Sequence, residues 1–119
     1  QYRKFHPAPP SLEEMSDALG DADPEFFQVL LAHNPNYFRQ YSKWGCDLVL
    51  SGHFHGGMVR LPKIGGVISP QFQLFPKYDA GEYQIGTSIM ILSRGLGNHS
   101  IKIRLFNRPE VSCITLKKK

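Results

Sequence analysis

The chain has 119 residues, of which 41 % are hydrophobic and 20 % are charged, a balance typical of a globular protein that excludes an intrinsically disordered one. A chain of this length folds as one small domain and buries roughly 65 % of the surface that its unfolded form exposes. Its 14 lysines and arginines exceed its 10 acidic residues, and the net charge of +4 indicates either a preference for anionic ligands such as phosphates or a solvated basic face.

Two cysteines, Cys46 and Cys113, lack the spacing of a disulfide framework or of a thiolate zinc site. We therefore expect both to act as small apolar side chains. No stretch reaches the roughly 18 apolar residues of a transmembrane helix, and no signal peptide is visible. The chain starts at Gln1 and not at methionine, which leaves room for a targeting segment upstream.

The first predicted element is a helix over residues 12–19. Ser11 and Glu14 match the capping box, in which the serine hydroxyl accepts a hydrogen bond from the N3 amide and the glutamate bonds back to the cap. Met15 belongs to an apolar stripe on one face of this helix, and Gly20 is suited to end it. This pattern indicates packing rather than chemistry.

A strand, a helix and a second strand are predicted next. Residues 26–32 are almost entirely apolar, which is typical of a strand buried on both faces in a parallel sheet. A helix over 35–43 follows at once, because Asn34 is a favoured N-cap and Pro35 a favoured first helical residue. Residues 47–51 form the second buried strand. Together these segments predict a parallel βαβ unit.

Short strands separated by glycine and proline are predicted in the second half of the chain, at 58–61, 66–69, 87–93, 101–106 and 111–116. The segment 62–83 is long and irregular, and it either wraps the ligand edge of the sheet or covers the sheet. The predicted fold class is α/β of the α+β type, in which a βαβ unit is followed by short mixed and antiparallel strands. No repeat and no second domain are visible.

Histidines follow both strands of the predicted unit. His33 comes directly after the first strand, and His53 comes after the second strand and a glycine. Because parallel strands end at the same edge of a sheet, both histidines are expected there, and open α/β sheets bind their ligands at this edge.

His55 lies two positions after His53. In an extended backbone this spacing directs both side chains to one face, with Cα atoms roughly 6.5 Å apart. Glycines on either side of the pair let an ion or a phosphate approach the backbone closely. Neutral imidazole suits zinc, iron, nickel and manganese. The sequence therefore predicts a metal site formed by His33, His53 and His55.

Several segments of the chain match a known pattern. They are Leu31-Ala32-His33-Asn34-Pro35, Leu50-Ser51-Gly52-His53-Phe54-His55-Gly56-Gly57, Arg60-Leu61-Pro62, Lys77-Tyr78, Ser93-Arg94-Gly95-Leu96-Gly97 and Pro109-Glu110-Val111. Nearly the whole chain, 1–119, resembles the C-terminal half of the bacterial calcineurin-like metallophosphoesterases, and the Gly-His-x-His-Gly-Gly segment is quite specific to that family. The resemblance implies the C-terminal portion of a single αββα sandwich domain, without its N-terminal half.

The resemblance also implies a site. His33 and His53 would bind one metal of a two-metal centre and His55 the other, with zinc, manganese or iron as the divalent ions. Such a centre hydrolyses phosphoric mono- or diesters, and the implied substrate is a phosphate-ester small molecule or a lipid-like molecule. Nucleic acid is not an expected partner. The family includes soluble, exported and membrane-associated proteins, so the resemblance leaves the compartment, and membrane association of the whole protein, open.

Two departures from the family pattern matter. Phe54 stands where relatives usually carry threonine. The family's N-terminal motifs, Asp-x-His, Gly-Asp and Gly-Asn-His, are missing, and these supply the metal-binding carboxylates. Asp47 cannot replace them, since it lies at the opposite end of its strand, up to about 20 Å from His53. We therefore expect the chain to be a poor catalyst alone and to self-associate through the sheet edge that the other half would pair with.

Two other interpretations stay open at this point. In the first, His33, His53 and His55 hold a single zinc in a non-catalytic module with one open coordination position. In the second, the histidines are structural and a basic face formed by Lys102, Arg104 and the C-terminal lysines binds an anionic surface or nucleic acid.

Overall fold

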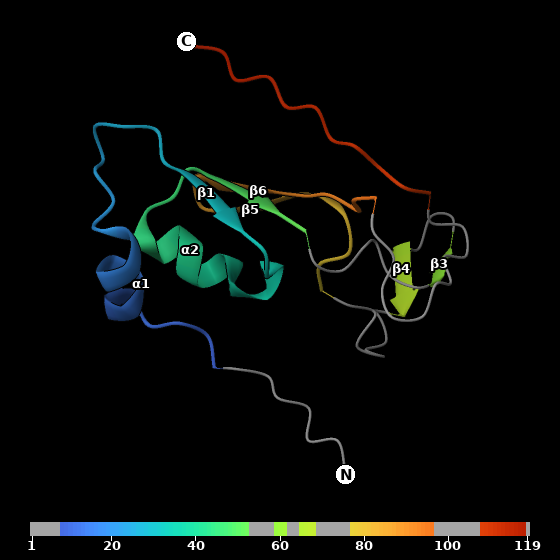
Figure 1. The fold of residues 1–119 in the computed structure, drawn as a ribbon, viewed down its shortest axis with the longest axis horizontal. Helices are drawn as coiled ribbons and strands as arrows, with labels where there is room; N and C mark the ends of the chain where they lie inside the picture. The colour runs from blue at the N-terminus through green and yellow to red at the C-terminus, as the bar shows by residue number, and fades with distance from the viewer. Residues whose placement is uncertain (1–7, 53–58, 62–64, 69–76, 97–107, 119) are drawn as a thin grey trace.

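A computed structural model describes residues 8–52, 59–61, 65–68, 77–96 and 108–118 of the chain. In chain order the elements are α1 (Leu12–Leu19), β1 (Val29–Ala32), a 3-10 helix η1 (Pro35–Tyr37), α2 (Phe38–Trp44), β2 (Leu48–Ser51), β3 (Val59–Leu61), β4 (Gly65–Ile68), β5 (Gly81–Ile85) and β6 (Ser88–Leu92) (Figure 1). None of the helices in the described part combines the length and the apolar character that crossing a membrane requires.

The central feature is a four-stranded sheet in the order β1-β2-β6-β5. β1 pairs parallel with β2, and β2 pairs parallel with β6, whereas β5 pairs antiparallel with β6. The predicted βαβ unit is therefore confirmed, and so is the α/β fold class with a mixed sheet. β3 and β4 form a separate antiparallel pair.

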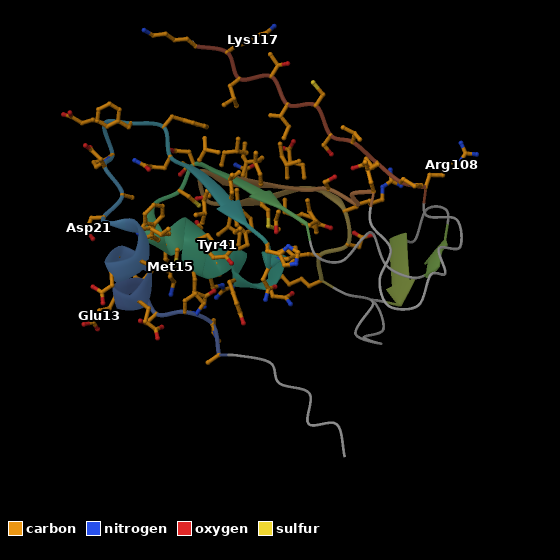
Figure 2. All side chains as sticks on the ribbon, viewed as in Figure 1. Glu13, Met15, Asp21, Tyr41, Arg108 and Lys117 are labelled. Atoms are coloured by element: carbon orange, nitrogen blue, oxygen red, sulfur yellow. The ribbon has the colours of Figure 1, made fainter. Side chains whose placement is uncertain are left out.

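The first helix begins and ends as predicted. The Glu14 amide donates to Ser11 Oγ at 3.1 Å, and the Ser11 amide donates to Glu14 Oε2 at 2.7 Å, which completes the capping box. Gly20 ends the helix with a φ of 80°, a conformation that favours glycine. Met15 is buried on the side of α1 that faces α2, whereas Glu13 lies on the outer side (Figure 2).

The second helix is also set by local signals. The Asn34 side chain accepts a hydrogen bond from the Asn36 amide at 3.1 Å, and Pro35 opens a 3-10 turn that continues into α2. Gly45 ends α2 in the left-handed conformation with a φ of 114°. The helix thus runs one residue beyond the predicted range.

The hydrophobic core lies between α2 and one face of the sheet (Figure 1). Phe38 is fully buried in it, and helix α1 adds Met15 at one end. Tyr41 from the same helix also belongs to this core, and Trp44 packs against it. The remaining core residues come from the strands, from the turn after α2 and from the segment that leads into β5, and they are Cys46, Val49, Tyr78, Met90 and Leu92.

One prediction about the first strand is wrong. β1 is shorter than 26–32 and is not buried on both faces, because Leu31 is 77 % exposed and Phe26 is 67 % exposed. The physical reason is that β1 lies at the edge of the described sheet and α2 covers only one face. On the other face, a hollow lies between Leu50 and Ile91 of the sheet and the C-terminal segment 108–118.

The strands predicted in the second half of the chain have different outcomes. β3, β4 and β6 are confirmed with small shifts of their ends, and 101–106 lies outside the described residues. The predicted strand 111–116 is wrong, since the described segment 108–118 has no regular secondary structure and Val111 and Leu116 are exposed. A strand requires a hydrogen-bonded partner, and none of the described strands pairs with this segment. β5 was not predicted; it begins inside the segment 62–83, which was expected to be irregular, and ends at Ile85.

The two cysteines differ in their environments. Cys46 is buried in the core, as expected for a small apolar side chain, but Cys113 is exposed, so the same prediction is wrong there. Cys113 has no core to enter, because the segment that carries it does not pack as a strand against the sheet.

Candidate functional site

The candidate site lies at the carboxyl edge of the three parallel strands. Ala32, Ser51 and Leu92 are in register across β1, β2 and β6. The residues that follow them therefore leave the sheet at one edge. His33 and Gly52, the residue before His53, are two of these, as the βαβ pattern predicts.

Hydrogen bonds from β2 connect the three chain segments at this edge. Ser51 Oγ donates to the His33 carbonyl at 3.4 Å, and the Ser93 amide donates to the Ser51 carbonyl at 3.0 Å. The backbone of His33 is thus held to the strand that leads to His53, while its side chain is exposed. An exposed imidazole on an anchored backbone can offer a ring nitrogen to a metal ion.

His33 is the one predicted metal ligand among the described residues, since His53 and His55 lie outside them. Within the described part, no group of three or more histidine, cysteine or acidic side chains could hold a metal ion. The roles of all three histidines therefore stay predictions. Their donor set, imidazole nitrogen alone, suits zinc or iron but brings no negative charge.

The structure confirms that Asp47 belongs to the opposite edge. Its carboxylate accepts a hydrogen bond from the Gln28 amide at 2.8 Å, and the Gln28 carbonyl accepts from the Asp47 and Leu48 amides at 3.0 Å each. These bonds close the amino ends of β1 and β2, where Val29 pairs with Leu48. Asp47 is therefore not a ligand for a metal at His33.

A contact that the sequence analysis missed ties the loop after β6 to the C-terminal segment. Arg94 donates from Nε to Glu110 Oε2 at 2.6 Å and also from Nη2 to the same oxygen. The Glu110 amide donates to the Gly95 carbonyl at 3.1 Å. Both residues belong to segments singled out in the sequence, but a separation of 16 residues carries no periodic signal that would pair them.

This contact changes the acidity of Glu110. Partial burial acts to raise the pKa of the Glu110 carboxyl, but the hydrogen bonds and the positive charge of Arg94 outweigh it, and the pKa lies below its ordinary value. Glu110 is therefore ionised at neutral pH and committed to Arg94. It does not serve as a proton donor or as a spare carboxylate for a metal.

The basic face of the second alternative is only partly described. Lys102 and Arg104 lie outside the described residues. Lys117 and Lys118 are exposed on the C-terminal segment, and Lys117 stands clear of the sheet (Figure 2).

No family model and no solved structure matches the chain. Curated proteins do match it. An uncharacterized metallophosphoesterase of Bacillus subtilis (strain 168), YkuE, is 35 % identical over 107 residues, which are 90 % of this chain and 34 % of the relative. The phosphodiesterase YaeI of Escherichia coli (strain K12) is 35 % identical over 89 residues, which are 75 % of this chain and 32 % of the relative.

The chain belongs to the metallophosphoesterase family. A further relative, the UDP-2,3-diacylglucosamine pyrophosphatase LpxG of Chlamydia muridarum (strain MoPn / Nigg), is 28 % identical in an alignment of length 109 that covers 82 % of this chain and 31 % of the relative. This metallophosphoesterase chain thus spans about a third of the length of the curated relatives that it matches. Its membership confirms the resemblance drawn from the histidine segments.

Proposed function

We propose that the protein carrying this chain hydrolyses phosphoric mono- or diesters at a two-metal centre, to which His33 and His53 contribute ligands for one metal and His55 a ligand for the other. The observation that carries the proposal is the parallel register of β1 and β2, in which the residue before His33 pairs with Ser51, two residues before His53. The names of the relatives support the reaction class, since they include a phosphodiesterase and a pyrophosphatase.

When bound, a pair of divalent metals would lower the pKa of a coordinated water and offset the negative charge of the phosphoryl group. In that chemistry, this chain would hold the metal ligands in place and orient them. The hydrogen bond from Ser51 to the His33 carbonyl fixes the backbone that carries the imidazole. Zinc, manganese or iron would suit the site, with the preference of imidazole for zinc and iron.

We propose that the chain is the C-terminal portion of one phosphoesterase domain and a poor catalyst by itself. Three neutral imidazoles offset none of the charge of two divalent cations, so the site needs carboxylates from elsewhere in the protein. Two described carboxylates, Asp47 and Glu110, are already engaged by the Gln28 amide and by Arg94.

The substrate that we propose is a phosphate ester of a small or lipid-like molecule. One relative is named for a phosphodiester and another for UDP-2,3-diacylglucosamine, which combines a pyrophosphate with acyl chains. Nucleic acid is not part of this proposal.

Metal content and hydrolysis test the proposal together. The full-length protein, His33→Ala and His53→Ala should be dialysed against trace metal and analysed by plasma mass spectrometry, then assayed with p-nitrophenyl phosphate and bis(p-nitrophenyl) phosphate. We expect two metals and hydrolysis in the parent, and loss of at least one metal together with at least about a hundredfold of the rate in either variant. His99→Ala, a histidine outside the motif, is the matched control.

The alternatives predict other outcomes. One metal per chain without hydrolysis would overturn the proposal in favour of the three-histidine module. Full metal content and full activity in both variants would remove the histidines from the site altogether.

A further inference from the structure

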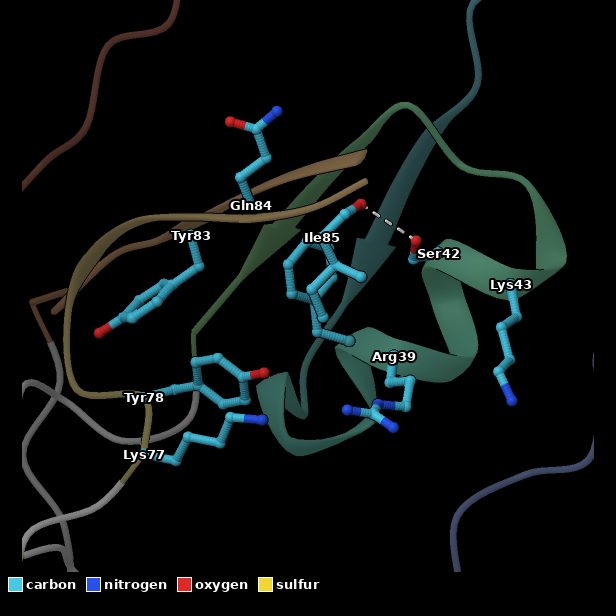
Figure 3. Close-up of a pocket in the computed structure, with 9 residues that line it drawn as sticks. Arg39, Ser42, Lys43, Lys77, Tyr78, Tyr83, Gln84 and Ile85 are labelled. Atoms are coloured by element: carbon cyan, nitrogen blue, oxygen red, sulfur yellow. Dashed lines mark hydrogen bonds between the residues drawn. The ribbon is translucent and has the colours of Figure 1, made fainter. Parts of the chain in front are cut away.

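The described part of the chain forms a hollow beside helix α2. It is a cleft of about 530 Å³ between α2 and the residues that lead into and form β5 (Figure 3). Ser42 Oγ donates to the Ile85 carbonyl at 3.3 Å and so ties the helix to the strand beside the cleft. The volume lies within the range of small-molecule sites in proteins, and its two walls are held together by the fold.

The charged side chains among the described residues that line this cleft are all positive. Arg39 and Lys43 come from α2, and Lys77 comes from the opposite wall (Figure 3). No carboxylate is among the described lining residues, and none of these three cations forms an ion pair within the described part of the chain. Arg39 and Lys43 are four residues apart on one helix face, where like charges repel each other. A bound anion would relieve this repulsion.

A buried hydroxyl points into the same space. Tyr78 is only 5 % exposed, and its hydroxyl is directed into the cleft toward the side of Arg39 (Figure 3). No described residue forms a hydrogen bond with this hydroxyl, although buried polar groups almost always have a partner. The other buried or half-buried tyrosines near the sheet differ: Tyr41 donates to the Asn34 carbonyl at 3.0 Å and Tyr83 donates to Asp79 Oδ1 at 2.8 Å.

The ring of Tyr78 is held in place by its neighbours. It packs edge-on against Phe38, with ring centroids 6.4 Å apart, and against Tyr83, with centroids 4.9 Å apart. Lys77 Nζ lies 5.0 Å from the centroid of the Tyr78 ring, and this cation–π contact keeps the ammonium on the same wall of the cleft as Tyr78. A hydroxyl donor and an ammonium are therefore preorganised around one space.

We propose that this cleft binds the phosphate group of a small organic phosphate. The Tyr78 hydroxyl would donate to a phosphate oxygen, Arg39 would offer its planar donors, and Lys43 and Lys77 would add charge. The ring of Tyr83 and the side chain of Ile85 would contact the organic part. His33 is not among the described residues that line the cleft, and the argument for phosphate binding uses none of the predicted metal ligands.

Phenyl phosphate is the probe, because it joins a phosphate to a flat apolar group. Calorimetric titration should use the full-length protein in excess chelator, so that phosphate cannot be bound by a metal centre. We expect one site per chain, weakened about tenfold in the double variant Arg39→Gln, Lys43→Gln and several-fold in Tyr78→Phe, which keeps the ring packing. Arg108→Gln, an exposed cation outside the cleft, should bind as the parent does.

Nuclear magnetic resonance locates the site in the parent protein without any variant. Amide shifts on titration should concentrate at residues 38–43 and 77–85. The proposal would be overturned if the amide shifts were confined to other regions, or if both cleft variants bound phenyl phosphate with unchanged affinity. It would also be overturned if the protein bound neither millimolar phenyl phosphate nor vesicles.

Vesicles distinguish a lipid headgroup from a soluble phosphate. If vesicles with phosphatidic acid compete with phenyl phosphate and those of phosphatidylcholine alone do not, the phosphate belongs to a lipid. If neither vesicle competes, the ligand is a soluble phosphate. Loss of hydrolysis in His53→Ala with unchanged phenyl phosphate binding would separate this site from the catalytic proposal.

Discussion

Arg94 and Glu110 join two segments of the family pattern through a double hydrogen bond to one carboxylate oxygen. Arg94 follows Ser93, whose amide bonds to Ser51 at the histidine edge, and Glu110 lies on the C-terminal segment. The ion pair therefore connects that segment to the edge where the metal ligands are predicted. Its side chains are each 28 % exposed, so solvent screens the pair only in part.

Glu110→Gln should lower the free energy of unfolding by about 1 kcal/mol at neutral pH. The folded-state pKa of Glu110 is below the ordinary value of 4.5, so its stabilising effect is fully present above that value and is lost as the pH falls through the folded-state pKa. Denaturant unfolding of both proteins from neutral to strongly acidic pH measures this. Glu82→Gln, on exposed β5, is the control, and a difference that persists at the acid end would contradict the assignment.

Phe38→Ala should destabilise the protein by about 3–5 kcal/mol, because Phe38 is 0 % exposed and the change leaves a cavity. A loss of this size is a large fraction of the stability of a small domain. Phe26→Ala, at a side chain that is 67 % exposed, removes the same group and should cost less than about 0.5 kcal/mol. Thermal melts of the two variants compare them directly, and equal losses would mean that α2 does not cover the sheet as described.

The two thiols should react at very different rates. Burial raises the pKa of the Cys46 thiol to about 11, and the negative charge of Asp47 adds to this effect. Only a very small fraction of this thiol is therefore ionised near neutral pH. Cys113 is exposed. An aromatic disulfide reagent should therefore modify one thiol rapidly in the folded protein and a second only after denaturation. Cys113→Ser should remove the fast phase, and a fast phase that survives this change would contradict the burial of Cys46.

The 119-residue chain by itself should self-associate, because β1 lies at the edge of the described sheet and its residue Leu31 is 77 % exposed. Light scattering at rising concentration should give masses above that of the monomer, and Leu31→Glu should return them toward it. Leu12→Glu, at an exposed leucine of α1, is the control. A parent chain that stays monomeric at high concentration would contradict this prediction.

Signals within a few residues of each other were sufficient to predict much of the fold. Ser11 and Glu14 define the start of α1, and Asn34 and Gly45 bound the second helical segment, since caps and left-handed glycines act over one turn of chain. The apolar runs with a helix between them predicted the parallel pair, and with it the edge at which His33 leaves the sheet. The role of His33 as a ligand stays a prediction.

Contacts between distant segments were decided only by the tertiary structure. The sequence of β1 is apolar on both faces, yet only the packing of α2 determines which face is buried, and so Leu31 is exposed. Arg94 bonds to Glu110, 16 residues further along the chain, and Tyr78 packs between Phe38 and Tyr83, because the tertiary fold places these residues next to one another. The sequence determines the chemistry of each side chain. The burial of a side chain and its contacts with distant residues depend on its neighbours in the tertiary structure, which no local sequence pattern specifies.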